Sequence, residues 1–238
     1  MNKYIKIILF IFILALVPIS FFKKDIILNY LNTNNLFFKI RSEMVVNEVW
    51  ITGLNFEEKE NIISSLKFNI GDPIYSIDLA EVKSRIDKLD WVNKVKVLAY
   101  PYGVIEIFIE EYKPFAVYNN AQEYFLINDE GFKFLKINKN EYKVHFQISG
   151  KDSLISLDDL KKLIQLFDNF NIKIDKVVRI DSRRWDFYFK NGLLIKLPAK
   201  ETFLVLKKFM NLDLNKMDYN KIGVIDLRIA ERLIIENK

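Results

Sequence analysis

Apolar and polar residues alternate along two neighbouring segments in the middle of the chain, which predicts a pair of β-strands. One face of each strand is apolar, and these faces carry Val95, Val97 and Ala99 in the first strand and Ile105, Ile107 and Ile109 in the second. The residues between them, Tyr-Pro-Tyr-Gly at 100–103, predict a turn. Matching the apolar faces requires an odd-numbered loop or a bulge, and Gly103 can supply the positive φ of a three-residue loop. We therefore expect a β-hairpin.

Two short helices and a further strand are predicted before this hairpin. Asn55 and Asp78 are each followed three residues later by Glu, a pattern typical of a helix start. Apolar residues then recur at spacings of three and four in the second helix, at Leu79, Val82, Ile86 and Leu89. Strand-like composition occupies residues 46–52. The order strand, helix, helix, strand, strand over residues 45–113 predicts an α+β unit in which both helices cover one face of a small sheet.

After Pro114 the pattern changes to short strands separated by turn residues. Asn191-Gly192 is a strong hairpin signal, and Asn128 to Gly131 predicts an open turn. Eight strands are expected, at residues 123–127, 132–137, 144–148, 176–181, 185–189, 193–197, 222–228 and 233–236. Ser156 is expected to cap one helix, and a second helix is expected over residues 199–210. Residues 114–238 are therefore predicted to form a β-rich domain of antiparallel strands with two helices.

The amino terminus has the pattern of a membrane anchor. Residues 5–22 are apolar apart from Lys6 and Ser20, and a helix of this length spans roughly 27 Å, close to the hydrocarbon core of a bilayer. The end of the segment lacks a small-x-small cleavage site, which favours an uncleaved transmembrane helix over a signal peptide. Residues 1–4 are then a short tail and residues 23–44 a stalk. Positive charges lie on both sides, so counting them leaves the orientation open.

Composition limits the chemistry that the chain can perform. The net charge is +5, and the lysines are scattered singly, which argues against a nucleic-acid-binding surface. The chain has no cysteine and a single histidine, His145, expected on the polar face of a strand, so a His/Cys metal site is excluded. The seven glycines form no phosphate-binding loop. No catalytic, cofactor or metal site is predicted, although a site built only from Asp, Glu, Lys or Tyr is left open.

Several short motifs occur in a characteristic order beyond residue 45. They comprise Val-Asn-Glu-Val-Trp-Ile-Thr-Gly at 46–53, Gly71 with Pro73, Leu89-Asp90-Trp91-Val92 with Val95 and Val97, Pro101, Glu111 with Pro114 and Ala116, Ile127 to Gly131, Arg184-Trp185, Asn191-Gly192 with Leu197, and Ile225-Asp226-Leu227-Arg228. Each motif alone is weak. In this order and spacing, they make the chain resemble the FtsQ/DivIB family of bacterial cell division proteins over nearly its whole length beyond Val45.

The resemblance implies a POTRA domain (βααββ) at 45–113 and an FtsQ-type β domain at 114–238. It also implies a non-enzymatic scaffold of the divisome, without a cofactor, that links early and late division proteins and binds FtsB and FtsL for septum assembly. The implied location is the plasma or inner membrane at the division septum, with the amino terminus cytoplasmic and the bulk of the chain periplasmic. The alternative is a POTRA-type periplasmic chaperone or export adaptor.

The same resemblance implies where a partner binds. In similar proteins FtsB adds a strand to the edge at the end of the β domain, which corresponds here to residues 228–236. The residue pattern agrees, because Leu233-Ile234-Ile235 is an apolar strand that would be an aggregation hazard as a bare edge. The expected partner-binding residues are Arg183, Arg184, Trp185, Arg228, Ile229, Glu231, Arg232, Leu233, Ile234 and Ile235. Ile229 departs from the family, in which an aromatic residue is common at this position.

Overall fold

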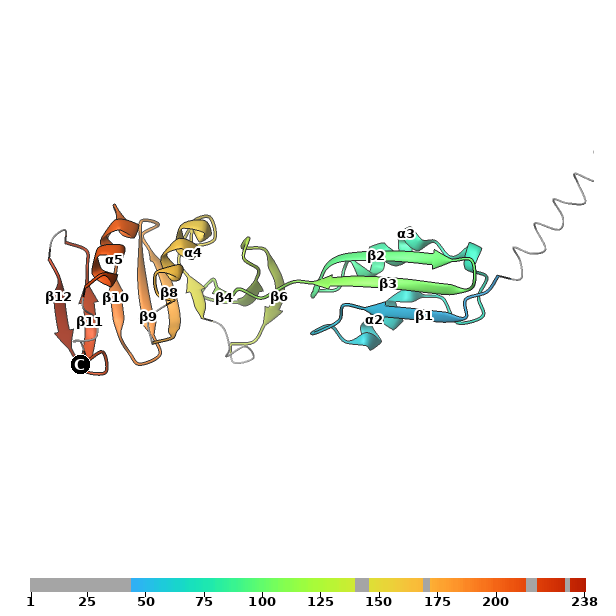
Figure 1. Ribbon diagram of the computed structural model, residues 1–238, viewed down its shortest axis with the longest axis horizontal. Helices are drawn as coiled ribbons and strands as arrows, with labels where there is room; N and C mark the ends of the chain where they lie inside the picture. Colours follow the sequence, from blue (N-terminus) through green and yellow to red (C-terminus); the bar gives the residue numbers. More distant parts are fainter. Residues whose placement is uncertain (1–43, 140–145, 169–171, 213–217, 230–231) are drawn as a thin grey trace, which may run out of the picture. The chain divides into compact units, whose positions relative to one another are not determined.

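The computed structural model describes residues 44–139, 146–168, 172–212, 218–229 and 232–238 (Figure 1). The chain divides into two compact units, one ending at Glu110 and the other beginning at Glu111. The predicted membrane anchor at 5–22, most of the predicted stalk and His145 lie outside the described residues. Among the residues described, no helix is both long and apolar enough to cross a membrane.

The first unit has the predicted order of elements, with one 3-10 turn in addition. Its elements are β1 (Glu48–Thr52), α2 (Lys59–Leu66), η1 (Ile74–Ser76), α3 (Leu79–Ile86), β2 (Val92–Tyr100) and β3 (Val104–Glu111). The sheet order is β1-β3-β2, and β1 runs parallel to β3. Apolar residues of both helices, including Ile62 and Ile86, form one core with Ile105 and Ile107 of β3. The unit is therefore a three-stranded sheet packed against two helices.

The hairpin between β2 and β3 turns through a three-residue loop at 101–103. Gly103 has φ of +92°, as the loop length requires, and its amide donates to the carbonyl of Tyr100 at 3.0 Å. A Cβ atom here would also lie 2.6 Å from the carbonyl oxygen of Val45. Glycine is thus required both by the backbone conformation and by the close approach of the chain before β1.

The two predicted helix caps have different outcomes. Asp78 caps α3 as expected, since its Oδ1 accepts from the amides of Ala80 at 2.9 Å and Glu81 at 3.0 Å. The prediction for Asn55 was wrong, because α2 begins later and its N-cap position is Glu58, whose side chain makes no capping bond. Asn55 instead donates to the carbonyl of Gly53 at 3.4 Å.

The second unit is built on one nine-stranded sheet. Its strands are β4 (Ala116–Asn119), β5 (Tyr124–Ile127), β6 (Lys133–Ile137), β7 (Gln147–Ser149), β8 (Ile174–Ile180), β9 (Arg184–Phe189), β10 (Leu194–Lys196), β11 (Ile222–Asp226) and β12 (Ile234–Asn237), and its helices are α4 (Leu157–Gln165) and α5 (Thr202–Met210). The order across the sheet is β12-β11-β10-β9-β8-β7-β4-β5-β6. The core lies between the sheet and the two helices, with Leu160, Trp185, Phe187 and Leu206 almost fully buried.

The prediction of an antiparallel sheet was wrong in part, because the sheet is mixed. β4 and β7, β7 and β8, and β10 and β11 are parallel pairs. The connections explain two of these pairs: α4 lies between β7 and β8, and α5 lies between β10 and β11. A helix carries the chain back to the starting end of the sheet, so that the next strand runs in the same direction. The other neighbouring pairs of this sheet are antiparallel.

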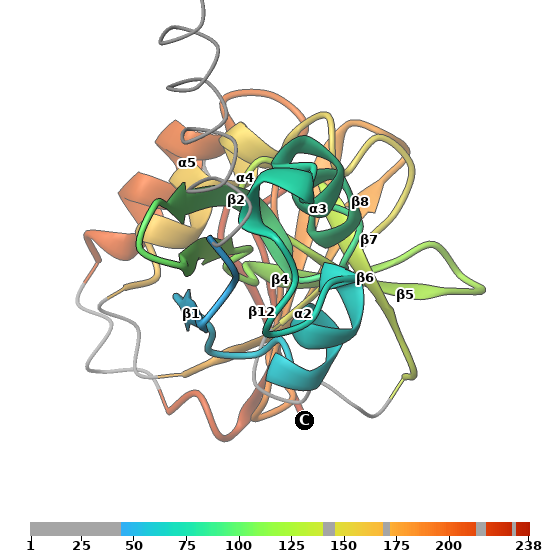
Figure 2. The same ribbon diagram turned by 90° about the vertical axis from the view of Figure 1, so that its right-hand side faces the viewer.

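The helix predicted after Ser156 is observed as α4, and its apolar stripe packs into the core through Leu157, Leu160 and Leu163. Ser156 occupies the N-cap position, but its side chain makes no capping hydrogen bond. The stripe therefore anchors this helix without the predicted cap. Helices α4 and α5 lie close to one another (Figure 2).

Candidate functional site

Strand β12 lies at one end of the nine-stranded sheet. It pairs antiparallel with β11, and the register sets Ile235 opposite Ile225 and Ile234 opposite Asp226 (Figure 1). Within the described residues no strand lies on its other side. The last strand of the chain is thus an edge.

The directions of the backbone groups in β12 follow from two hydrogen bonds. The amide of Lys238 donates to the carbonyl oxygen of Lys221 at 2.9 Å. The amide of Leu227 donates to the carbonyl oxygen of Lys196 in β10, also at 2.9 Å. Backbone groups of successive residues in a strand point to opposite sides. Asp226 therefore points toward β12, and Ile235 directs its own N–H and C=O away from β11. The backbone N–H and C=O of Ile235 are therefore a hydrogen-bond donor and acceptor at the open side of the sheet.

The side chains of β12 also alternate between the two faces of the sheet. Ile225 is completely buried in the core beneath the helices, so Ile235, which lies opposite it, is on the helix-covered face. Ile234 and Glu236 lie on the other face, beside Asp226 and Val224. Ile234 and Ile235 are 39% and 41% exposed, respectively. The edge thus presents one isoleucine on each face.

The opposite edge of the sheet, β6, is protected in a way that β12 is not. Lys133 and Lys136 are exposed in this strand. Lysines on an edge strand are a common device against edge-to-edge pairing. A register shift occurs beside both edges, between Leu126 and Ile127 and between Ile222 and Val224, so the lysines make the difference. Strand β12 has the sequence Ile-Ile-Glu-Asn and contains neither lysine nor proline. It is the edge better suited to accept another strand.

Asp226 and Arg228 fix the corner at which the chain leaves β11. The guanidinium of Arg228 donates through Nη2 to Oδ2 of Asp226 at 2.6 Å and through Nε to both carboxylate oxygens at 2.9 Å. The amide of Arg228 also donates to Oδ1 at 3.0 Å. The side-chain hydrogen bond from Arg228 lowers the pKa of Asp226 despite its burial. This bidentate pair orients the segment that leads into β12.

An apolar groove lies beside this corner. Its volume is about 330 Å³. Its described lining comes from α5 with the residues next to it and from the stretch between β11 and β12: Glu201, Leu204, Val205, Lys208, Phe209, Leu212, Leu227, Ile229, Arg232 and Leu233. Leu204, Leu212, Ile229 and Leu233 are each at least 39% exposed. Only one acidic residue, Glu201, is among these ten, whereas Lys208 and Arg232 are basic. The groove therefore suits apolar side chains accompanied by acidic ones.

Sequence reasoning identified Ile229, Arg232 and Leu233 but missed the α5 side of the groove. Leu204 and its neighbour Phe203 are 47% and 46% exposed on a helix whose buried residues are Leu206 and Phe209. In the sequence, Phe203 and Leu204 form one continuous apolar run with the next two residues, so no local pattern marks the pair as exposed.

The three residues expected near 184 occupy different environments. Arg183 is in the turn between β8 and β9, with its side chain 70% exposed and its Nη2 3.5 Å from Asp181. Arg184 lies 3.4 Å from Asp186, whose pKa is raised by burial. Trp185 is buried in the core, and the guanidinium of Arg179 lies 4.8 Å from its ring centroid. Only Arg183 of the three presents a largely exposed side chain.

Arg183 lines a second hollow of about 450 Å³ between α4 and α5. Glu201 and Leu204 line both this hollow and the groove. The structure thus connects Arg183 through the start of α5 to the groove beside β12. Glu231, the remaining expected residue, lies outside the described residues. No group of three or more His, Asp or Glu side chains that could hold a metal ion occurs in the described part of the chain.

Comparison with protein families gives two adjacent matches. Residues 44–112 match the FtsQ-type POTRA domain, and residues 116–228 match the C-terminal region of the cell division protein FtsQ/DivIB. The two matched segments together cover well over half of the chain. The second match ends at Arg228, so β12 follows it directly.

Relatives in curated collections carry the same description. The cell division protein FtsQ of Rickettsia felis is 28% identical over 233 residues, which covers 98% of this chain and 86% of the relative. The protein of the same name from Rickettsia conorii is 28% identical over 208 residues, covering 87% and 75% of the two chains. That of Rhizobium meliloti is 22% identical over 192 residues, covering 80% and 62%.

Proposed function

The chain belongs to the FtsQ/DivIB family of cell division proteins, with a POTRA domain of the FtsQ type, and from this premise we propose that it is a non-enzymatic scaffold of the divisome. It links early and late division proteins and binds FtsB and FtsL during septum assembly. The observation that carries the proposal is the edge strand β12, whose outer side has no neighbouring strand in the described residues.

A partner strand binds by adding to β12. The N–H and C=O groups of Ile235 point toward the open side, so they pair with the partner backbone, while Ile234 and Glu236 keep their backbone bonds to β11. This type of binding derives affinity from main-chain hydrogen bonds and specificity from alternate side chains. Because Ile234 and Ile235 lie on opposite faces, the partner strand needs an apolar residue on each face to cover both.

The groove supplies the second part of the recognition. It continues the helix-covered face beside Ile235, and Leu204 and Leu233 contribute exposed apolar walls. An apolar side chain of the partner inserts there, and acidic side chains next to it meet Arg232 and Lys208. Arg183 extends this basic rim through the neighbouring hollow. Charged rims of this kind raise association rates and restrict the choice of partner more than they add affinity.

The membrane location is part of the same proposal. Residues 5–22 form the transmembrane anchor, residues 1–4 lie in the cytoplasm, and the two domains at 45–113 and 114–238 lie in the periplasm at the septum. The apolar pattern of residues 5–22 supports a spanning helix, and membership of a division-site membrane protein family supports the location. The anchor keeps the partner-binding edge near the membrane that carries its partners.

Co-purification tests the proposal. The tagged full chain is coexpressed with FtsB and FtsL of the same organism and purified from detergent-solubilised membranes. We expect both partners to co-purify, and we expect Ile235→Glu to abolish this while leaving the circular dichroism spectrum unchanged. The exposed isoleucine Ile63 in the first unit, which is 50% exposed, provides the control variant Ile63→Glu. Equal recovery of FtsB with wild type and Ile235→Glu would exclude the edge as the binding site.

A further inference from the structure

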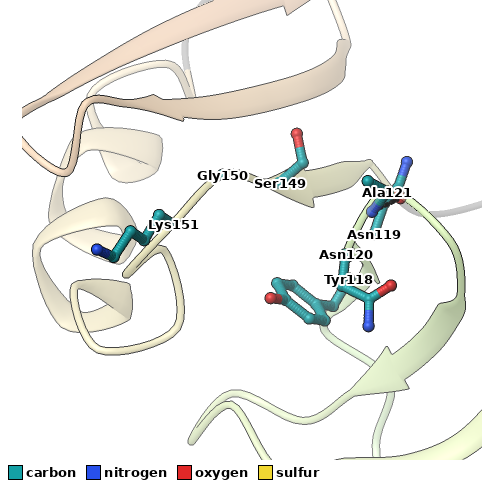
Figure 3. Close-up of a pocket in the computed structure, with 7 residues that line it drawn as sticks. All are labelled: Tyr118, Asn119, Asn120, Ala121, Ser149, Gly150 and Lys151. Atoms are coloured by element: carbon teal, nitrogen blue, oxygen red, sulfur yellow. Dashed lines mark hydrogen bonds between the residues drawn. The ribbon is translucent and has the colours of Figure 1, made fainter.

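A further hollow in the β domain lies beside the last residues of β4 and β7. Its volume is about 480 Å³, and its described lining consists of Tyr118, Asn119, Asn120, Ala121, Ser149, Gly150 and Lys151 (Figure 3). The side chains of Ser149 and Lys151 point away from the other lining side chains. These polar groups therefore do not converge on one ligand, and the first unit offers a stronger feature.

The first unit has one end at which two loops are bonded to the chain that enters it. The amide of Val46 donates to the carbonyl oxygen of Asp72 at 2.9 Å, and the amide of Gly71 donates to the carbonyl oxygen of Val46 at 2.8 Å. The amide of Asn47 donates to the carbonyl oxygen of Gly103 in the hairpin loop at 2.7 Å. At this end β1 and β3 begin and β2 ends (Figure 1). We call it the entry end, and it comprises residues 44–47, 68–77 and 99–103.

Large apolar side chains are exposed at the entry end. Ile70 and Tyr75, between α2 and α3, and Tyr102, in the hairpin loop, are each at least 49% exposed. The ring of Tyr102 stacks on that of Tyr100, with 5.3 Å between the ring centroids. Single exposed apolar residues are normal, but three on adjoining segments mark a surface that meets a partner or a membrane.

The acidic side chains at and beside the entry end are engaged within the unit. Oδ2 of Asp72 accepts from the amide of Asn69 at 2.7 Å. Glu48, the first residue of β1, accepts at 2.7 Å from Nε1 of Trp50, which lies further along that strand. Asp78 uses its Oδ1 to cap α3. Each carboxylate thus has a hydrogen-bond partner, and Asp72 is the one charged residue of the entry end itself.

The opposite end of the first unit is strongly charged. It is formed by residues 54–60 and 87–91, which contain Glu57, Glu58, Lys59, Glu60, Asp87, Lys88 and Asp90. Its exposed aromatic residue, Phe56, stacks on Trp91, with 4.6 Å between the ring centroids. Charged side chains favour water over a less polar layer. The two ends therefore differ, and the entry end is the one suited to a less polar layer.

The sequence before the entry end connects it to the proposed membrane anchor at 5–22. The 21 residues at 23–43 reach at most about 75 Å, even if they are fully extended. A tether of this length holds the bilayer surface at a high effective concentration around the unit, so that weak affinity is sufficient for docking. The membrane is thus the apolar partner that the chain itself brings to the entry end.

We propose that the entry end docks on the surface of the lipid bilayer. Ile70 enters the boundary between headgroups and acyl chains. The rings of Tyr75 and Tyr102 lie at headgroup level, where tyrosine is enriched because its ring is apolar and its hydroxyl is polar. Lys67, exposed next to the end of α2, meets the lipid phosphates. This inference rests on the proposed anchor and does not depend on the β12 edge.

Fluorescence quenching by the lipids of a nanodisc tests this proposal. The chain has no cysteine, so Pro101→Cys places a single nitrobenzoxadiazole label at the entry end and Asn55→Cys places one at the opposite end, both at exposed positions. The full chain is inserted into nanodiscs of phosphatidylethanolamine and phosphatidylglycerol, with or without lipid that carries a nitroxide quencher at headgroup level. We expect at least twofold quenching of the label at position 101 and little quenching of the label at position 55.

Variants in the other loop separate docking from mere closeness to the bilayer. Ile70→Ser combined with Tyr75→Ser is expected to remove most of the quenching at position 101, with the circular dichroism spectrum unchanged. Ile63→Ser, at an exposed isoleucine of α2 outside the entry end, is the matched control and is expected to leave the quenching as it is.

The possible results distinguish docking from the anchor. Docking is overturned, and the anchor kept, if the chain stays with the nanodiscs while the label at position 101 is unquenched, is quenched no more than the label at position 55, or is quenched equally in the double serine variant. A chain that does not stay with the nanodiscs overturns both the anchor and the docking. The affinity for FtsB reports on the β12 edge separately.

Discussion

Arg228 donates hydrogen bonds to the carboxylate of Asp226 from both its guanidinium and its backbone amide. The last residue of β11 is thereby bound to the second residue after it. This arrangement fixes the point at which the chain turns toward β12. Removing it should both destabilise the β domain and loosen the edge strand.

We expect Asp226→Asn to lower the free energy of unfolding by about 1 kcal/mol at neutral pH, since Arg228 is partly exposed. The pKa of Asp226 is lowered on folding by Arg228, below its value of about 3.9 in unfolded chains. The stabilisation that ionised Asp226 contributes to the folded state is therefore fully present above the unfolded-state pKa, and it is lost as the pH falls through the folded-state pKa. Denaturation at pH values between 2.5 and 7 measures the difference in free energy of unfolding between wild type and Asp226→Asn. A difference that stays constant over this range would contradict the prediction.

Asp186 should have the opposite pH dependence. It lies across Lys196 from Asp226 in the sheet, but burial raises its pKa in spite of the nearby charges of Arg184, Lys196 and Arg228. A carboxyl whose pKa is raised on folding favours the folded state below the unfolded pKa, and this contribution is lost as the pH rises through the folded-state pKa. Relative to Asp186→Asn, the wild type should lose stability as the pH rises from the unfolded-state pKa of Asp186 through its folded-state pKa. The same denaturation series decides the sign.

The two helix starts offer a matched pair of substitutions. Asp78→Ala removes two hydrogen bonds to the first turn of α3 and should destabilise the first unit by about 1 kcal/mol. Ser156→Ala removes a side chain that makes no capping bond in α4, so we expect a change within about 0.5 kcal/mol. Chemical denaturation followed by circular dichroism separates the two cases. Equal losses would show that capping is not the cause.

The groove beside β12 can be tested without touching the edge itself. Leu204→Glu places a negative charge in an exposed position of the wall contributed by α5, and we expect at least a tenfold loss of FtsB affinity with an unchanged fold, because an apolar contact is removed and acidic partner side chains are repelled. Lys207→Glu, an exposed position on the same helix outside the groove lining, is the control. Comparable losses for both variants would indicate a general charge effect.

The sequence predicted most elements because alternation and helical spacing are local properties. The hairpin at Gly103, the stripe of α4 and the last strand all follow from such patterns. Strand direction and strand order do not, because an alternating strand has the same pattern beside a parallel or an antiparallel neighbour. The three parallel pairs were missed for this reason.

The candidate site was predictable in part for the same reason. The position of β12 in the chain and its apolar residues were visible, but its place at the end of the sheet depends on pairings between distant segments. Trp185 was expected at a partner surface from its motif. In the structure β9 is buried at three consecutive residues, Trp185, Asp186 and Phe187, so the tryptophan belongs to the core. The groove depends on packing between α5 and the segment before β12, which no local pattern encodes.

The central claim is that a partner strand pairs with the outward backbone of β12, and a single proline tests it most directly. Proline lacks an amide hydrogen and is tolerated on an edge strand where its nitrogen faces outward. Ile235→Pro removes an amide that points away from β11, whereas Ile235→Val changes the side chain modestly and keeps that amide.

The measurement is the affinity of the full chain for FtsB in detergent, for wild type, Ile235→Val and Ile235→Pro, with the β-sheet circular dichroism signal as the fold control. We predict near wild-type affinity for the valine variant and at least a tenfold loss for the proline variant, with the fold preserved in both. Full affinity of a folded Ile235→Pro variant would contradict strand addition at β12.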